Sequence, residues 1–158
     1  PLAARDVFRN PWHFLAYGFG AGLARRAPGT AGTVVAIPIY LLVQLGGIWF
    51  YLGFTLAAFF AGIAICGYTA RKMGIDDPSG VVWDEIVGYL ISMAAAPLGV
   101  LWIVAGFVLF RIFDIWKPWP IRVLDRRVKG GLGIMLDDVV AGLFTAILLA
   151  LAVHFLNL

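Results

Sequence analysis

Residues 84–110 read DEIVGYLISMAAAPLGVLWIVAGFVLF, and this stretch decides the fold. After two initial acids it contains no Asp, Glu, Lys or Arg, so its apolar part is long enough for one membrane-spanning helix of about 20 residues. Pro97 nevertheless lies in its middle, two residues before Gly99, and this combination is typical of a turn. The alternative to a single span is a helical hairpin, with helices from about Gly80 to Ala95 and from about Leu98 to Lys117.

The distribution of basic residues distinguishes these two topologies. The hairpin places all 12 Lys and Arg residues on one side of the membrane, whereas the single span leaves six on each side. Cytoplasmic loops of membrane proteins carry an excess of Lys and Arg. The positive-inside rule therefore favours the hairpin, and it predicts that every charged loop faces the cytoplasm.

Two further runs of the chain, residues 27–70 and 139–158, contain no charged side chain. The first run is long enough for two helices, and the pair Gly46-Gly47 is the natural break between them. These runs predict helices from about Thr33 to Leu45, from about Ile48 to Ala70 and from about Asp138 to Phe155.

The composition agrees with a membrane protein. Hydrophobic residues make up 62% of the 158 residues and charged residues 13%, whereas soluble domains have about 45–50% and about 25%. We therefore expect one domain, residues 1–158, with an all-α fold: an integral membrane bundle of about five membrane helices (four to six). The segment from Asp6 to Tyr17 is expected to form a helix that lies in the membrane interface. The net charge of +3 is too small to indicate nucleic-acid binding.

The hairpin topology brings three polar segments to the cytoplasmic face, namely residues 18–33, 76–85 and 111–138. The first segment is rich in glycine and leads into a helix, where backbone N–H groups attract phosphate. Thr30 and Thr33 are candidates for capping that helix or for donating to a phosphate oxygen. Glycines also permit close packing of membrane helices, so both interpretations stay open.

Five carboxylates at the edges of the apolar runs are candidate catalytic residues: Asp84, Glu85, Asp114, Asp137 and Asp138. Carboxylates next to hydrocarbon are costly unless they face a partner or a polar cavity. We expect the two adjacent pairs to be Mg²⁺ ligands, because an oxygen-only set suits this ion, and Asp114 to be a further ligand or a base. Helix capping combined with ion pairs is the alternative role.

Basic residues of the third polar segment stand beside these acids. Cations that hold phosphoryl oxygens next to a metal site are what phosphomonoester hydrolysis requires. The candidates for binding a substrate phosphate are Arg111, Lys117, Arg122 and Lys129, together with the two threonines of the first segment.

Several strings of the chain resemble the phosphatidylglycerophosphatase A family, in order and in spacing, from about Trp12 to Ala150. They are Gly18-Phe-Gly-Ala-Gly, Ala27-Pro-Gly-Thr-Ala-Gly-Thr33, Val82-Trp-Asp-Glu85, Phe110-Arg-Ile-Phe-Asp114, Lys117-Pro-Trp-Pro-Ile-Arg122 and Lys129-Gly-Gly-Leu-Gly-Ile-Met-Leu-Asp-Asp138. The resemblance implies an all-α, Mg²⁺-dependent enzyme of the bacterial inner membrane. It also implies hydrolysis of phosphatidylglycerophosphate, a membrane lipid, to phosphatidylglycerol and phosphate.

Two other classes of function remain as alternatives. A small membrane transporter also places charged residues beside broken helices, but its site usually lies near the middle of the membrane. A non-catalytic membrane scaffold would not require so many acids beside bases. Release of phosphate from the lipid by the purified protein separates these alternatives from a phosphatase.

Overall fold

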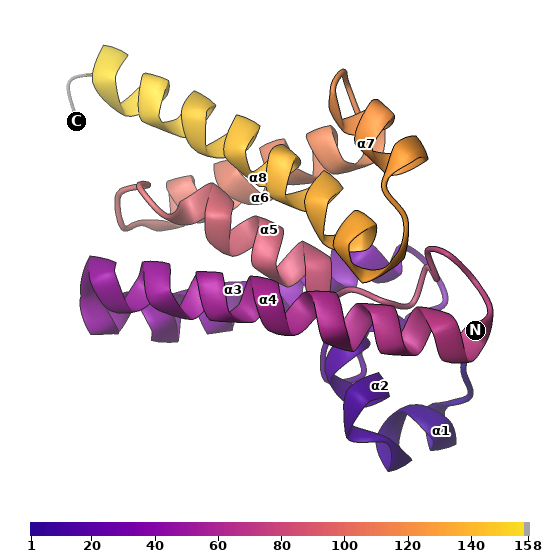
Figure 1. Cartoon of the computed structure of the whole chain (residues 1–158). Helices are drawn as coiled ribbons and strands as arrows, with labels where there is room; N and C mark the ends of the chain where they lie inside the picture. Colours follow the sequence, from indigo (N-terminus) through magenta and orange to yellow (C-terminus); the bar gives the residue numbers. More distant parts are fainter. Residues whose placement is uncertain (157–158) are drawn as a thin grey trace.

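The computed structural model describes residues 1–156, and this part of the chain folds into helices joined by short loops (Figure 1). The α-helices are α1 (Ala4–Arg9), α2 (Pro11–Ala16), α3 (Pro28–Val43), α4 (Gly47–Met73), α5 (Trp83–Met93), α6 (Val100–Trp116), α7 (Ile121–Arg127) and α8 (Gly130–Phe155). Short 3₁₀ helices lie at Ala21–Leu23, between α2 and α3, and at Gln44–Gly46, between α3 and α4. Within residues 1–156 there is no strand, so the all-α class is confirmed.

The centre of the bundle is α5, which packs against α3, α4, α6 and α8. Figure 1 shows α3 and α4 side by side, with α5 between this pair and the layer of α6 and α8. The inner face of α5 is buried through Tyr89, Leu90 and Met93, which contact Phe110 of α6 in the same apolar core. This packing holds the first turn of α5, with its two acids, inside the bundle.

The helical hairpin is confirmed. Helix α5 ends at Met93 and α6 begins at Val100, so the chain breaks on both sides of Pro97. Gly99 has φ 144°, a backbone conformation that favours glycine, and it permits the reversal into α6. The break between α3 and α4 also falls at the predicted pair Gly46-Gly47. Gly47 has a φ of 82°, a backbone conformation that favours glycine.

The number of membrane spans is not confirmed. Two helical stretches are long and apolar enough to cross a membrane, namely Pro28–Met73, which includes α3 and α4, and Gly130–Phe155. Helix α5 has 11 residues and therefore a length of about 16 Å at 1.5 Å per residue. The hydrocarbon core is about 30 Å thick, so α5 by itself does not span it.

The start of the last helix was predicted wrongly. Helix α8 begins at Gly130, with Lys129 as its N-cap, and so includes Asp137 and Asp138 in its interior. These acids were expected to begin the helix because they end the preceding polar segment. Inside α8, Asp137 pairs with Lys117 from the loop after α6, and Asp138 lies against the acids of α5.

The N-terminal segment is divided into two short helices. Asn10 has an extended backbone between α1 and α2, and Pro11 occupies the first position of α2, where its missing N–H costs nothing. The side chain of Asn10 accepts a hydrogen bond of 2.9 Å from the Trp12 backbone and so caps α2. A single helix from Asp6 to Tyr17 is therefore not formed.

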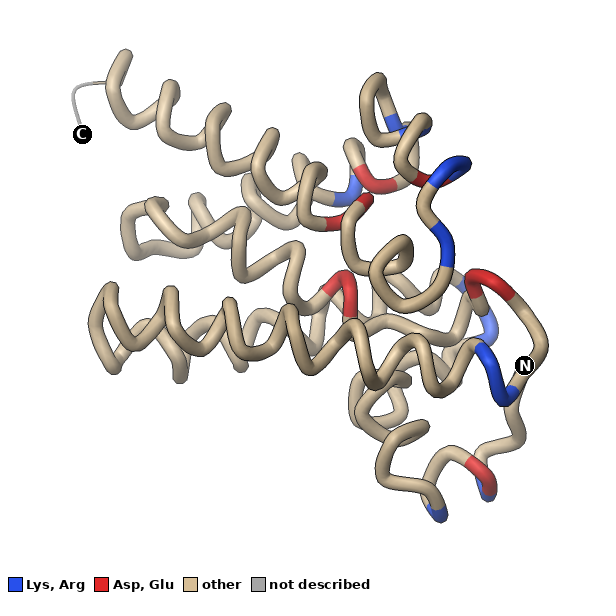
Figure 2. The backbone as a smooth tube through the Cα atoms, in the orientation of Figure 1, with Lys and Arg blue, Asp and Glu red and all other residues tan. Residues whose placement is uncertain are grey.

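Charged residues gather in one half of the molecule. Figure 2 shows the Lys, Arg, Asp and Glu positions on the side that carries α7 and the N-terminal helices, while the opposite ends of α3, α4, α5 and α8 have none. Large apolar side chains are exposed at this end of the molecule, including Trp49 of α4, Val100 of α6 and Phe155 of α8. Soluble monomers rarely expose apolar patches of this extent, so the surface indicates association with a membrane.

Candidate active site

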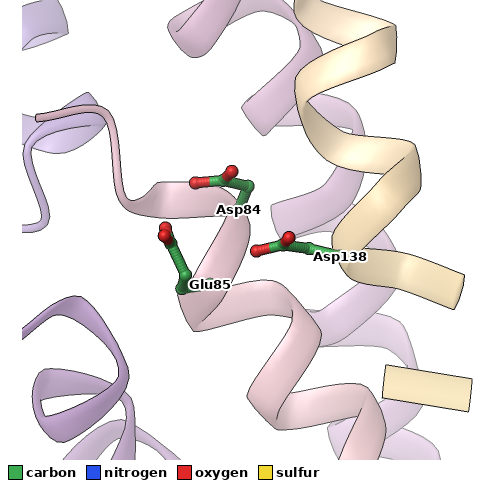
Figure 3. Close-up of side chains that lie close together, drawn as sticks. All are labelled: Asp84, Glu85 and Asp138. Atoms are coloured by element: carbon green, nitrogen blue, oxygen red, sulfur yellow. The ribbon is translucent and has the colours of Figure 1, made fainter. Parts of the chain in front are cut away.

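Three carboxylates meet where α5 and α8 cross. Asp84 and Glu85 lie in the first turn of α5, and Asp138 reaches them from α8 (Figure 3). One oxygen from each of the three lies within 4.8 Å of the other two. Asp84 is 7% exposed and Asp138 is 2% exposed, so this acid triad is almost completely removed from water.

Two glycines allow α5 and α8 to approach closely enough to form the acid triad. A Cβ atom on Gly88 of α5 would lie 3.0 Å from the backbone oxygen of Asp138, and one on Gly142 of α8 would collide with the carbonyl of Gly88. Larger residues at these positions would separate the helices. The glycines therefore determine that Asp138 reaches the start of α5.

The acid triad has the properties of a cation site. One oxygen of each acid, namely Oδ1 of Asp84, Oε2 of Glu85 and Oδ2 of Asp138, is buried without a hydrogen-bond partner. Burying a charged group without a partner is strongly unfavourable, and three together repel one another. A hard divalent cation such as Mg²⁺ fits this set, because it prefers carboxylate oxygens and would neutralise the repulsion.

A positive group lies beside the acid triad. The guanidinium of Arg111 pairs with Asp114, one turn further along α6, and its Nη1 atom lies 3.8 Å from Oε1 of Glu85. The charge of Asp114 acts on both Glu85 and Asp138, so Asp114 borders the same group of acids. The Nε atom of Arg111 is buried and has no partner, which leaves one donor for a further ligand.

The N-terminus of α3 also packs against this site. Ala27 has a left-handed backbone with φ 47°, and Pro28 begins the helix. A Cβ atom on Gly29 would collide with Oε1 of Glu85 and would lie 3.0 and 3.1 Å from the terminal nitrogens of Arg111. The glycine-rich segment therefore brings the start of α3 close to the acids, in addition to allowing helices to pack.

The two threonines of this segment differ. Thr30 lies in the first turn of α3 and is half-buried. Thr33 is fully buried, and its hydroxyl donates a hydrogen bond of 2.9 Å to the backbone oxygen of Gly29. Thr33 therefore stabilises α3 internally, whereas the side chain of Thr30 makes no hydrogen bond within residues 1–156.

Asp137 is separated from the acid triad. Its Oδ2 atom accepts a hydrogen bond of 2.9 Å from Nζ of Lys117, which makes a second bond of 2.9 Å to Oδ1 of Asp125. Its Oδ1 atom accepts from the backbone N–H of Asp138. Burial alone would lower the pKa of Lys117, but the bonds to Asp125 and Asp137 raise it above its usual value.

A polar hollow of about 210 Å³ opens on the other side of Asp137, bordered by α7, α8 and the loop before α5. Its lining includes Asp77, Asp125 and Lys129. Partial loss of hydration raises the pKa of Asp77, the carboxylates of Asp125 and Asp114 raise it further, and Lys117 and Lys129 oppose the shift. Asp77 was not among the predicted site residues, although it lies in the same polar segment as Asp84.

Among the phosphate-binding candidates, only Arg111 contacts the acid triad. Lys117 is held between Asp125 and Asp137, while Lys129 donates to the backbone oxygen of Asp125 at the rim of the hollow. Arg122 is exposed on α7, and within residues 1–156 no acid lies within ion-pair distance of it.

Comparisons with known proteins identify a single family. The family model described as phosphatidylglycerophosphatase A matches residues 14–153. The chain is 46% identical to the phosphatidylglycerophosphatase A of Escherichia coli (strain K12) over 144 residues, which cover 90% of this chain and 84% of that protein. It is also 46% identical to the phosphatidylglycerophosphatase A of Haemophilus influenzae, with 87% of this chain and 86% of that protein covered.

A more distant relative carries a different name. A protein of Bacteroides thetaiotaomicron, provisionally named a phosphatidylinositol-3-phosphatase, is 41% identical over 143 residues, which cover 85% of this chain and 89% of that protein. No solved structure matches the chain significantly.

Proposed function

Because the chain belongs to the phosphatidylglycerophosphatase A family, we propose that it hydrolyses the terminal phosphomonoester of phosphatidylglycerophosphate to give phosphatidylglycerol and phosphate. The observation that carries this proposal is the family match over residues 14–153, which includes every member of the acid triad. Hydrolysis of a lipid phosphate also suits a buried polar site inside an apolar bundle.

Mg²⁺ is the proposed cofactor, and Asp84, Glu85 and Asp138 are its proposed ligands. The support is their unpartnered buried oxygens, all of the type that this ion prefers. When bound, the ion would neutralise charge on the phosphoryl oxygens and lower the pKa of water. The acids contribute a fixed site that is closed to bulk solvent, which strengthens electrostatic interactions inside it.

Arg111 and the start of α3 are proposed to hold the substrate phosphate. The backbone N–H groups at a helix start attract anions, and Gly29 brings this start next to the guanidinium. Asp114 is proposed to orient Arg111 through their ion pair. Thr30 follows Gly29 in the first turn of α3, and its hydroxyl is a further proposed donor.

Lys117 and Lys129 are proposed to serve the entrance to this site. Lys117 fixes Asp137 and Asp125 relative to each other, and Lys129 stands at the rim of the polar hollow. Their positive charges would attract an anionic headgroup, an effect that decreases with ionic strength. Arg122, which lies outside the hollow, is proposed to bind anionic lipid at the membrane surface.

We further propose that the chain crosses the bacterial inner membrane several times and that its site faces the cytoplasm. The support is the separation of a charged half from an apolar half, together with the excess of Lys and Arg in the charged half. α5 and α6 would form a hairpin whose turn lies at the same end of the bundle as the loop between α3 and α4, because Gln44, Gly47, Ala96 and Leu98 line a common cavity.

The test is release of inorganic phosphate from phosphatidylglycerophosphate by the purified protein, with Mg²⁺ and after its removal with a chelator. We expect release only when the ion is present. Phosphatidylinositol-3-phosphate is the comparison substrate, because one relative carries that name. A transporter or a scaffold would release phosphate from neither lipid, and that result would refute the proposed activity.

A further inference from the structure

An apolar groove runs along the outside of the bundle. It begins near the acid triad and leads away from it. It has a volume of about 440 Å³ and lies between α4 and α8, with the end of α5 as its floor. One wall extends from Leu52 to Phe59 on α4 and the other from Val139 to Ala146 on α8. Each wall spans eight residues, or about 10 Å of helix.

The groove starts next to the candidate active site. Val139, at one end of its α8 wall, directly follows Asp138 of the acid triad. On the α4 wall, Phe59 follows Ala58, whose backbone oxygen accepts a hydrogen bond of 2.9 Å from the indole of Trp83, the residue before Asp84. Both walls then lead toward the apolar half of the molecule.

We propose that this groove binds an acyl chain of the lipid substrate; the inference rests on the proposed function. A lipid whose phosphate lies at the acid triad must extend its chains toward the apolar half, which is the direction of the groove. The volume is within the range of about 300–1,000 Å³ that small-molecule sites have. A groove of this volume suits one hydrocarbon chain.

A buried hydroxyl in the groove agrees with this occupant. Thr55 lies on the α4 wall and is 8% exposed, and its Oγ1 atom has no hydrogen-bond partner. An unpaired hydroxyl in apolar surroundings is unfavourable. The ester carbonyl at the head of an acyl chain is an acceptor for this hydroxyl, whereas a purely hydrocarbon side chain of a partner protein offers none.

The experiment compares two phosphatidylglycerophosphates, one with 16-carbon chains and one with six-carbon chains, in the same detergent. Ala146→Phe places a ring in the groove, and Leu143→Trp is a second filling variant at a more exposed position. We expect each to lower the ratio of kcat/KM for the long-chain substrate to kcat/KM for the short-chain substrate about tenfold. The control is Ala57→Phe, which adds the same ring to the opposite, exposed side of α4 and should leave both values unchanged.

A binding measurement separates this inference from the proposed activity. Phosphatidylglycerol with a photoactivatable acyl chain should label residues 52–59 and 139–146 in preference to other exposed helices, and Ala146→Phe should reduce this labelling. Uniform labelling of all lipid-facing helices, or an unchanged substrate ratio in both filling variants, would overturn the groove as an acyl site. If the native protein releases no phosphate from either lipid, the activity fails, and the labelling alone still decides whether the groove binds a chain.

Discussion

The Nζ atom of Lys117 lies 2.9 Å from Oδ2 of Asp137, and this ion pair gives two adjacent acids of α8 different surroundings. Asp137 has a cation from the chain itself, whereas Asp138 lies with Asp84 and Glu85 in the acid triad, where the charge of Asp114 also acts on it. The two neighbours in sequence are therefore expected to have different roles. Asp138 is left for a bound cation, and Asp137 holds the loop between α6 and α7 against α8.

Substitution of these two acids should have different results. Asp138→Asn should abolish tight Mg²⁺ binding and lower kcat by at least about 100-fold, because metal catalysis supplies several kcal/mol. Asp137→Asn should keep Mg²⁺ binding and mainly lower the melting temperature, since Lys117 loses one of its two partners. Calorimetric titration with Mg²⁺ and phosphate-release assays measure both. If Asp137→Asn loses Mg²⁺ binding and Asp138→Asn keeps it, then Asp137 is the metal ligand and Asp138 has the structural role.

Gly29→Ala tests the approach of α3 to the acid triad. The added methyl group would collide with Glu85 and press on the guanidinium of Arg111, so one of them must move. We expect kcat/KM for the lipid substrate to fall about tenfold or more, because displacements of about 1 Å are costly to catalysis.

The matched control for Gly29→Ala is Gly53→Ala. Gly53 lies in the exposed part of α4, where a Cβ atom would meet nothing within 4 Å. It should retain full activity and melt at the same or a higher temperature, because alanine favours a helix by about 1 kcal/mol over glycine. Equal activity of the Gly29 and Gly53 variants would show that α3 takes no part in the site.

Cys66→Ala should retain most activity, and thiol alkylation should not inhibit the native protein. Cys66 is fully buried in α4, so its sulfur is inaccessible to substrate and to reagents. Its loss leaves a small cavity, and a modest fall in melting temperature is the expected cost. A folded but inactive Cys66→Ala protein would contradict a mechanism based on carboxylates.

Local signals in the sequence were sufficient for the turns and for the start of α5. Pro97 with Gly99 predicted the hairpin, and the helix expected from about Gly80 begins three residues later, at Trp83, next to the two acids. The start of α8 was missed because charge was used as its boundary. Asp137 is tolerated inside that helix because Lys117 pairs with it, whereas Asp138 lies against the α5 acids, and both are tertiary relationships.

The membership of the acid triad was predictable only in part. Adjacent residues on a helix are rotated by about 100° from each other, and here Asp137 faces Lys117 while Asp138 faces the acids of α5. Which of the two turns toward α5 depends on the packing of Gly88 against α8, and no local pattern records it. Asp77 was missed for the same reason, because its neighbours Asp125 and Asp137 lie far away in sequence.

Asp77→Asn should raise stability at neutral pH only slightly, because Asp77 is exposed in the loop before α5 and solvent screens its charge. The pKa of Asp77 is raised in the folded protein, so folding is penalised once this carboxyl ionises. That penalty is absent below the unfolded pKa of about 3.9 and grows as the pH rises through the higher folded value. The variant should therefore melt above the native protein at pH 7 and together with it at acidic pH. A lower melting temperature of the variant at pH 7 would show that the charge of Asp77 is stabilising.

The proposed topology predicts which ends of the bundle can be reached from outside the cell. The loop between α3 and α4 and the loop between α5 and α6 meet at the apolar end, where Gln44, Gly47, Ala96 and Leu98 line a common cavity. Single cysteines in a Cys66→Ala background report on each end. Leu45 and Leu98 are suitable positions at the apolar end, being 74% and 68% exposed, and Arg126 is exposed on α7.

A membrane-impermeant maleimide applied to intact cells should label Leu45→Cys and Leu98→Cys, and it should label Arg126→Cys only after permeabilisation. The reason is the positive-inside rule applied to a chain whose basic residues gather at one end. Each variant should still release phosphate from the lipid, which controls for correct insertion. Labelling of Arg126→Cys in intact cells would place the acid triad on the outer side and would exclude a cytoplasmic active site.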